Sequence, residues 1–410
     1  MKNGKTVLGF AFLVSAAFLA ACQPQTRVSV DEELRTRANK LAQKLILIDT
    51  HQDTPYRLQK KMQEISKRTK TGDFDYPRAR QGGLDALFMA VYVPAEYQEK
   101  GGAFAFADKT IDMIEGFAET WPDKFAIARS IVDIKSQFGH DRISIAMGIE
   151  NGAPIEGNLA NLKYFYDRGI RYITLVHSKN NHICDSSYDK ERKWNGLSPF
   201  GAELVPEMNR LGMIIDVSHV SDEAFYQIIE LSKAPVVATH SSCRHFTPGW
   251  QRNMDDEMIR LLAKNGGVIQ INFGSIFVSR QVHKRFIDVR KHVADYVETH
   301  NLTGSRKEQY IKKYRQEHPR GDADISDVVA NIDHVVNLVG IDHVGLGSDF
   351  DGVGGHLPRG LEDVSCYPNL IYELLKKGYT EEHIKKICSD NFLRVWSLVQ
   401  RTGLELQSSN

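Results

Sequence analysis

The chain has 410 residues, and its 52 Lys and Arg are balanced by 52 Asp and Glu, so the summed charge favours neither nucleic acid nor an acidic substrate as a partner. A hydrophobic fraction of 42% and a charged fraction of 25% are typical of a globular protein that folds in water. The length is sufficient for one large barrel or for two ordinary domains.

The first 21 residues are predicted to be a bacterial export signal. Two lysines give a positive start, and the nearly uncharged segment 6–21 is too short and wrongly flanked for a membrane-spanning helix. The segment runs into the sequence LAAC, which resembles a bacterial lipoprotein processing box. We therefore expect cleavage after residue 21, a lipid anchor on Cys22 and a polar tether over 22–30; Gln23 favours the outer membrane, with the protein facing the periplasm. An ordinary cleaved signal and a retained membrane helix are the alternatives.

Residues 31–410 contain no linker and are predicted to form a single domain. Eight short runs of apolar, often β-branched residues alternate with amphipathic helical patterns. The runs cover 45–51, 86–93, 143–150, 172–177, 213–219, 235–240, 267–273 and 343–350. Eight such units predict an α/β fold, a parallel (β/α)8 barrel of the TIM type. A doubly wound open sheet is the alternative, but the number of units and the length favour closure.

A long charged segment, residues 274–330, lies between the seventh and the eighth predicted strand. Its helical periodicity predicts a pair of helices beside or over the mouth of the barrel. Three roles remain open: a lid over the mouth, a solvated excursion, or a basic face that binds a partner.

Chemically active residues stand at the ends of six predicted strands. His51 and Asp53 end the first strand and, being two positions apart on an extended chain, point to the same side. The others are, in order, Glu150, His177, His219, His240 and Asp349. Because a parallel barrel presents the C-terminal ends of its strands at one mouth, we expect these residues to converge, although a single such histidine would more often be an ordinary core or loop residue. Histidines in charged helical stretches are interpreted as surface residues: His283, His292, His300, His318 and His383.

Histidine and carboxylate ligands without cysteine favour zinc, or a similar divalent ion, in a catalytic site with open positions. Five ligands exceed what one tetrahedral ion needs, so we predict two Zn²⁺ ions that share Glu150 as a bridge. His51 and Asp53 are expected to hold one ion, and His219 and His240 the other. A water between two ions becomes a hydroxide nucleophile near neutral pH, which predicts hydrolysis of an amide or an ester.

Asp349 lies in the Gly-rich sequence GLGSDFDG. We predict that it takes the proton from the water and passes it to the leaving amine. A turn-forming aspartate is the alternative interpretation. Asp351 is the less favoured candidate and is expected to shape the loop.

The cysteines are not predicted to carry the chemistry. Four lie beyond Cys22, namely Cys184, Cys243, Cys366 and Cys388. In an exported protein they permit three disulfide pairings, but none has the C-x-x-C spacing of a zinc or redox site.

Nine short motifs occur in an order and spacing that point to a known family. They are DTHQDTP, GIENG, GIRYITLVHS, IDVSHVSD, THSSCR, QRNMDDE, GLGSDFDGV, GLEDVSCYPNL and NFLRVW. From about residue 45 to about residue 400, the chain resembles the membrane dipeptidase (renal dipeptidase) family, metallopeptidases within the amidohydrolase-like barrels. Most other amidohydrolases have His-x-His on their first strand, so His-x-Asp also points to this branch.

The resemblance implies the binuclear zinc ligands given above, with Asp349 as the catalytic acid. It also implies that His177 contacts the substrate near the scissile carbonyl and helps to stabilise the oxyanion, and that Arg252 binds the C-terminal carboxylate. From the residues alone, Arg244 is as good a candidate as Arg252 for binding this carboxylate. The family hydrolyses dipeptides and tolerates a D-residue at the C-terminal position. The segment SKNNHICDSSYD after His177 departs from the family pattern, so we do not predict which of its residues contact the substrate in the pocket.

The leading hypothesis is an exported, lipid-anchored zinc dipeptidase. A second enzymatic hypothesis keeps the metals and changes the substrate to an N-acyl amino acid or a lactone. A third, a metal-binding lipoprotein without catalysis, requires a missing ligand or acid, and none is missing. A homodimer is compatible with the sequence, and no nucleic-acid partner is expected.

Overall fold

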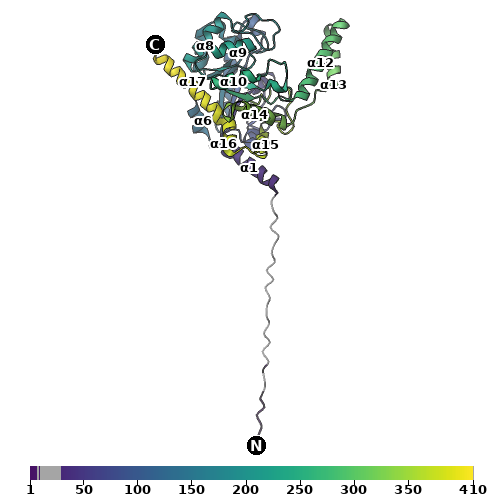
Figure 1. Ribbon diagram of the computed structural model, residues 1–410. Helices are drawn as coiled ribbons and strands as arrows, with labels where there is room; N and C mark the ends of the chain where they lie inside the picture. The colour runs from purple at the N-terminus through teal and green to yellow at the C-terminus, as the bar shows by residue number, and fades with distance from the viewer. Residues whose placement is uncertain (7–8, 10–28, 410) are drawn as a thin grey trace.

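The computed structural model describes residues 1–6, 9 and 29–409 (Figure 1). The predicted lipidation site Cys22, with most of the predicted signal peptide and tether, lies outside the described residues. Among the described helices, none has a stretch that is both long and apolar enough to cross a membrane.

Eight parallel strands form a barrel. In their order around the sheet, they are β1 (Ile48–Gln52), β2 (Ala86–Tyr92), β4 (Ile143–Glu150), β5 (Ile170–Thr174), β6 (Ile214–Asp216), β7 (Val237–Ser241), β8 (Val268–Ile271) and β9 (Val344–Leu346). The sheet closes between the segments of β9 and β1, where the Asp53 amide donates to the Phe350 carbonyl (2.9 Å). The Asp349 amide donates to the His51 carbonyl at the same junction (3.0 Å). The predicted barrel is confirmed, and the open-sheet alternative is wrong.

A further strand, β3 (Phe125–Ile127), was not predicted. It pairs in parallel with the first residues of β4 and lies off the main order of the barrel. Three residues are too few to produce a recognisable hydrophobic period, so this strand could not be predicted from the sequence. The third to eighth predicted strands therefore correspond to β4 through β9.

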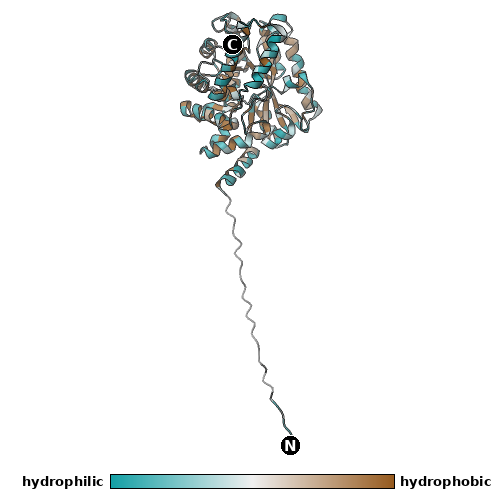
Figure 2. Cartoon of the chain, turned by 90° about the vertical axis from the view of Figure 1, so that its right-hand side faces the viewer, coloured by the Kyte–Doolittle hydropathy of each residue, from teal (hydrophilic) through white to brown (hydrophobic). Residues whose placement is uncertain are grey.

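Helices cover the outside of the barrel (Figure 1). They are α1 (Val30–Lys44), α2 (Thr54–Lys60), α3 (Tyr76–Gly82), α4 (Tyr97–Lys100), α5 (Ala103–Thr120), α6 (Ile131–Gln137), α7 (Leu159–Asp167), α8 (Pro199–Leu211), α9 (Asp222–Leu231), α10 (Asp256–Lys264), α11 (Ser275–Val278), α12 (Arg280–Thr299), α13 (Gly304–Glu317), α14 (Ile325–Val339), α15 (Tyr367–Lys376), α16 (Glu381–Lys385) and α17 (Asn391–Ser408). Figure 2 shows apolar strands at the centre and hydrophilic stretches on the surrounding helices. This distribution is that of a single barrel core covered by amphipathic helices.

Aromatic residues of α17 close the N-terminal end of the barrel. Phe392 and Trp396 lie against Phe88 of β2, with ring centroids 5.3 and 5.5 Å apart. Phe88 in turn lies 5.3 Å from the ring of Tyr172 on β5. These rings belong to an apolar cluster that includes the first residues of β1, β2, β6, β7 and β8. The interior is therefore packed at this end, and the polar residues of the strands gather at the opposite, C-terminal end.

The segment between β8 and β9 contains the predicted pair of helices. α12 and α13 form a hairpin that projects away from the barrel (Figure 1). Their contacts are largely between rings: Tyr296 stacks on Tyr310 (4.0 Å) and His292 on Tyr314 (4.2 Å). No residue of α13 is buried, so most of the hairpin contacts solvent.

His283 does not follow the prediction of surface histidines. It lies in the first turns of α12 and is buried, with its ring 4.8 Å from that of Trp250. The prediction was wrong because the base of α12 packs against the barrel, and the charged composition of the helix does not show which turn is covered. Three of the other histidines are exposed, as predicted: His292, His300 and His318.

Candidate functional site

The seven residues predicted from the strand ends lie together at the C-terminal mouth of the barrel. They form three overlapping groups, in each of which potential ligand atoms lie within 4.8 Å of one another. The groups are His51, Glu150 and His240; Glu150, His177 and His219; and His51, Asp53 and Asp349. Because His51 and Glu150 each belong to two groups, the residues form one continuous cluster, which we call the mouth cluster.

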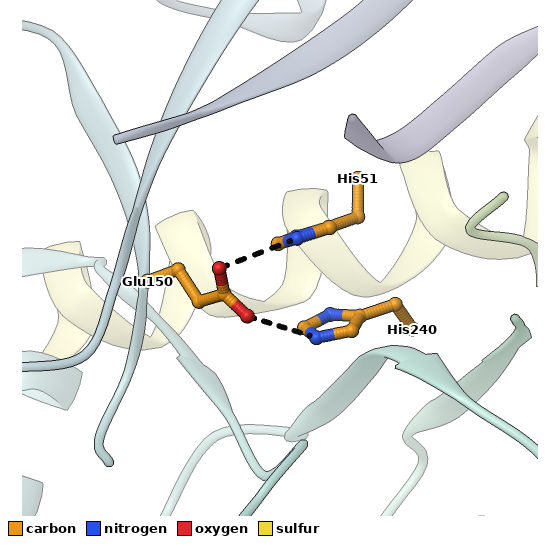
Figure 3. Close-up of side chains that lie close together, drawn as sticks. All are labelled: His51, Glu150 and His240. Atoms are coloured by element: carbon orange, nitrogen blue, oxygen red, sulfur yellow. Dashed lines mark ion pairs between the residues drawn. The ribbon is translucent and has the colours of Figure 1, made fainter. Parts of the chain in front are cut away.

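The Glu150 carboxylate lies at the centre of the mouth cluster (Figure 3). Its Oε2 is 3.7 Å from His51 Nε2. Its Oε1 is 3.2 Å from His219 Nε2 and 3.3 Å from His240 Nε2. His177 Nε2 lies 3.4 Å from the same oxygen. The two carboxylate oxygens thus face different histidines, an arrangement suited to a carboxylate shared by two cations.

Hydrogen bonds behind two of the imidazoles fix the orientation of their rings. The Tyr172 hydroxyl lies 2.8 Å from His51 Nδ1, and the Thr239 hydroxyl lies 2.8 Å from His240 Nδ1. Asp216 accepts a hydrogen bond from the Thr239 hydroxyl (2.6 Å) and so holds it in place. With Nδ1 engaged on both rings, Nε2 is the nitrogen that faces the centre of the cluster.

Asp53 and Asp349 lie beside each other where the barrel closes. The Asn272 side-chain amide donates to Asp349 Oδ2 (2.7 Å). A Cβ atom at Gly352 would collide with Asp349 Oδ1 and Asp53 Oδ2, so the glycine leaves room for both carboxylates. Asp349 and His219 have φ values of 62° and 69°, in the left-handed region that disfavours residues other than glycine. The backbone is therefore held in an unfavourable conformation where it presents these two side chains.

Burial opposes charge on the carboxyl groups of the mouth cluster. It raises the pKa of Glu150 and of Asp53 well above the usual range, and the neighbouring carboxylates raise both further. Burial also raises the pKa of Asp349 to about 6, against the opposing charge of the Arg252 guanidinium. Three buried carboxylates within one cluster are unfavourable without positive charge nearby.

Burial acts on the imidazoles in the opposite direction. It lowers the pKa of His51, His219 and His240 well below the usual range, and nearby positive groups, including Arg252, lower these values further. The pKa of His177 falls to about 3 for the same reasons. The rings are therefore neutral near pH 7, the form in which imidazole binds a metal ion.

The mouth cluster fits a divalent cation by its donor chemistry. Neutral imidazoles and carboxylates are the ligands of zinc and similar ions in catalytic sites. Two potential metal-ligand atoms, His51 Nε2 and Asp53 Oδ1, are buried and have no hydrogen-bond partner among the described residues. A cation bound here would satisfy these atoms and would compensate the buried carboxylates.

Arg252, and not Arg244, faces the mouth cluster. Its Nη2 donates to the His240 carbonyl (2.8 Å) and lies 3.1 Å from His219 Nε2. Arg244, which had equal standing in the sequence, forms an ion pair with Asp222 (2.6 Å). The structure thus distinguishes two arginines that could not be told apart by residue type or by position in the sequence.

A pocket of about 420 Å³ opens from the mouth cluster. Its base is formed by cluster residues and Arg252, namely Asp53, Glu150, His177, His219, Arg252 and Asp349. Its outer part includes Arg290 of α12 and Arg320, which follows α13. The predicted helical insertion therefore contributes side chains to the same pocket as the mouth cluster.

Several supporting residues were not predicted from the sequence. Asn272, Tyr172 and Thr239 lie in predicted strands, and a polar side chain within an apolar run was the signal that could have found them. Arg290 and Arg320 gave no signal, because both lie in a segment with many basic residues.

The four cysteines among the described residues are free thiols, so none of the permitted disulfides is present. Three of the four are buried: Cys184, Cys243 and Cys388. None of these four cysteines belongs to the groups that could hold a metal ion.

The family model for membrane dipeptidase (peptidase family M19) matches residues 35–410. The dipeptidase aclJ of Aspergillus oryzae is 34% identical over 342 residues, which are 82% of this chain and 72% of that relative. An uncharacterised dipeptidase of Schizosaccharomyces pombe is 32% identical over 373 residues, 87% of this chain and 81% of that relative. The crystal structure of the probable dipeptidase PvdM from Pseudomonas aeruginosa has a TM-score of 0.79 and 25% identity, covering 90% of this chain and 99% of that chain. The chain therefore belongs to the membrane dipeptidase family and is a metallo-dipeptidase, a peptide hydrolase.

Proposed function

We propose that the chain hydrolyses dipeptides with two zinc ions that share Glu150. The observation that carries this proposal is the position of the Glu150 carboxylate between His51 on one side and the pair His219 and His240 on the other. Asp53 is the second protein ligand of the ion held by His51. Neutral imidazoles and buried carboxylates support zinc as the metal.

Two such ions would acidify a water molecule and polarise the peptide carbonyl of the substrate. The side chains of the pocket account for positioning and proton transfer. The neutral His177 ring, beside Glu150, donates a hydrogen bond to the carbonyl oxygen as that oxygen gains negative charge. Asp349, held by Asn272, accepts a proton from the water and gives it to the leaving amine.

Arg252 binds the C-terminal carboxylate of the dipeptide in this proposal. Its guanidinium lies in the pocket, close to His219, and its planar fork matches a carboxylate. A carboxylate held there places the adjoining peptide bond near the mouth cluster. Dipeptides with a C-terminal D-residue are included among the proposed substrates, as the family resemblance implies.

Purified protein is expected to hydrolyse dipeptides with a free C-terminus, to lose this activity to a chelator and to regain it with Zn²⁺. Amidated dipeptides are expected to have kcat/KM values about 100-fold lower, because Arg252 loses its charged partner. Measuring kcat/KM over a panel with L- and D-residues at the C-terminal position checks this.

The substitution Arg252→Gln is expected to remove most of the difference in kcat/KM between dipeptides with a free C-terminus and amidated dipeptides. Arg260→Gln, at an exposed arginine of α10, is the matched control and should preserve it. N-acyl amino acids and lactones belong in the same panel. If they are turned over faster than every dipeptide, the proposed substrate class is wrong.

We also propose that the protein is exported and anchored by a lipid on Cys22, facing the periplasm. The processing box after the uncharged segment supports this location. Metabolic labelling with a fatty-acid analogue is expected to label the wild-type protein and to leave Cys22→Ser unlabelled. Equal labelling of both proteins would contradict the anchor.

A further inference from the structure

Two arginines of the insertion line the same pocket as the mouth cluster. Arg290 lies on α12 and Arg320 follows α13; we call them the outer arginine pair. Among the described residues, neither guanidinium has a carboxylate within 4.0 Å, the limit for an ion pair. Asp322, the acidic residue closest to Arg320 in sequence, pairs with His356 instead (3.2 Å). The outer arginine pair therefore brings positive charge to the pocket without an ion-pair partner in the part of the chain that the structure describes.

The two guanidinium groups share one aromatic support. Arg290 lies 5.3 Å and Arg320 5.8 Å from the ring centroid of Phe286. Arg320 is partly buried, and its Nε has no hydrogen-bond partner among the described residues. Burial lowers the pKa of Arg320, against the opposing charge of Asp322, and the charge of Arg315 lowers it further. A cation held in these surroundings gains more from an anionic ligand than a solvated surface arginine does.

A series of aromatic rings joins the outer arginine pair to Arg252. The Arg252 guanidinium lies 5.2 Å from the ring centroid of Phe277. Phe277 lies 5.0 Å from Trp250, and Trp250 lies 6.5 Å from Phe286. All three arginines therefore line one pocket and adjoin one continuous set of aromatic rings.

We propose that the outer arginine pair binds a second carboxylate of the substrate, carried by the side chain of its C-terminal residue. The preferred substrates are then dipeptides that end in Asp or Glu. This inference rests on the proposed function, in which Arg252 holds the main-chain carboxylate of that same residue. A side-chain carboxylate of the residue bound by Arg252 then extends within this pocket, towards the two guanidinium groups.

The test compares two dipeptides of nearly the same shape, Ala-Asp and Ala-Asn, each with an L- and a D-residue at the C-terminal position. For wild-type protein, the ratio of kcat/KM for Ala-Asp to that for Ala-Asn is expected to be about 10 or more, because a charge-assisted contact is present only with Asp. The substitutions Arg290→Gln and Arg320→Gln are expected to lower this ratio towards 1, and Arg320→Gln more strongly because that side chain is partly buried.

Lys307→Gln is the matched control, because it removes one positive charge from an exposed position of α13. Lys307→Gln should preserve the ratio. If this control lowers the ratio as much as the arginine substitutions do, the hairpin attracts acidic dipeptides only through its overall positive charge, and the proposal is overturned. Wild-type turnover of both dipeptides without a preference would overturn this inference alone. Hydrolysis of neither dipeptide would contradict the proposed function, and this inference with it.

Discussion

Replacing Asp349 by Asn will lower dipeptide turnover by about 10³-fold or more, while the protein keeps its full metal content. Asparagine preserves the shape of the side chain but cannot accept a proton and return it. Burial raises the pKa of Asp349 to about 6, near the range in which a base is effective at neutral pH, and Asn272 fixes its position. Steady-state kinetics and elemental analysis of zinc per chain measure the two outcomes.

Asp351 offers a matched control on the same loop. It shares the left-handed conformation (φ 67°), but its carboxylate is engaged by Arg57 (2.9 Å). Asp351→Asn should therefore lower the melting temperature and affect turnover far less. The metal analysis is essential, because Asp349 lies within ligand distance of His51 and Asp53. If Asp349→Asn loses metal and activity together, Asp349 is a ligand and the proposed proton transfer is wrong.

Glu150→Gln is expected to remove metal and activity together. Glutamine has the same size, but it lacks the negative charge and presents an NH₂ group to one side of the cluster, where a bridging ligand needs an oxygen. Zinc affinity should fall by more than about 100-fold, the upper end for residues that only support a ligand. Titration calorimetry of the metal-free protein with Zn²⁺ measures this loss.

The metal-free variant should not be less stable than metal-free wild type. Because burial raises the pKa of Glu150, ionisation of this carboxyl destabilises the metal-free fold as the pH rises, and glutamine avoids that effect. At pH 8, thermal unfolding of metal-free Glu150→Gln should therefore occur at the same or a higher temperature. Glu298→Gln, at an exposed glutamate of α12, controls for the replacement of a carboxylate by an amide. If Glu150→Gln retains two zinc ions at wild-type affinity, Glu150 is not a shared ligand.

The mouth cluster was predictable because each member closely follows or ends a recognisable apolar strand. His51, Glu150 and Asp349 are far apart in sequence, yet a parallel barrel has only one C-terminal mouth, so topology alone brings them together. Residue type then indicated a metal, since imidazoles and carboxylates with no cysteine are catalytic-site ligands. The prediction needed neither the strand boundaries nor the packing.

The contributions of the insertion were not predictable in the same way. Helical periodicity indicates that a helix has an apolar face, but it does not give the position of a hairpin relative to the barrel. For that reason, His283 was expected on the surface and is buried, and the outer arginine pair could not be distinguished from the other basic residues nearby. The equal totals of acidic and basic residues also gave no indication of the three arginines that line the pocket, because a whole-chain sum does not reveal a local excess.

The junction of β1 and β9 links parts of the chain that are far apart in sequence. The Ser348 amide, for example, donates to the Asp49 carboxylate (2.8 Å), 299 positions away. Bringing such distant segments together reduces the conformational entropy of the chain. The proposed ligand His51 belongs to β1 and Asp53 directly follows it, while the other proposed ligands lie on or just after other strands of the barrel. Metal uptake therefore favours the joined state, and the joined state favours metal uptake. The zinc ions would therefore contribute to the free energy of unfolding as well as to the hydrolysis of substrate.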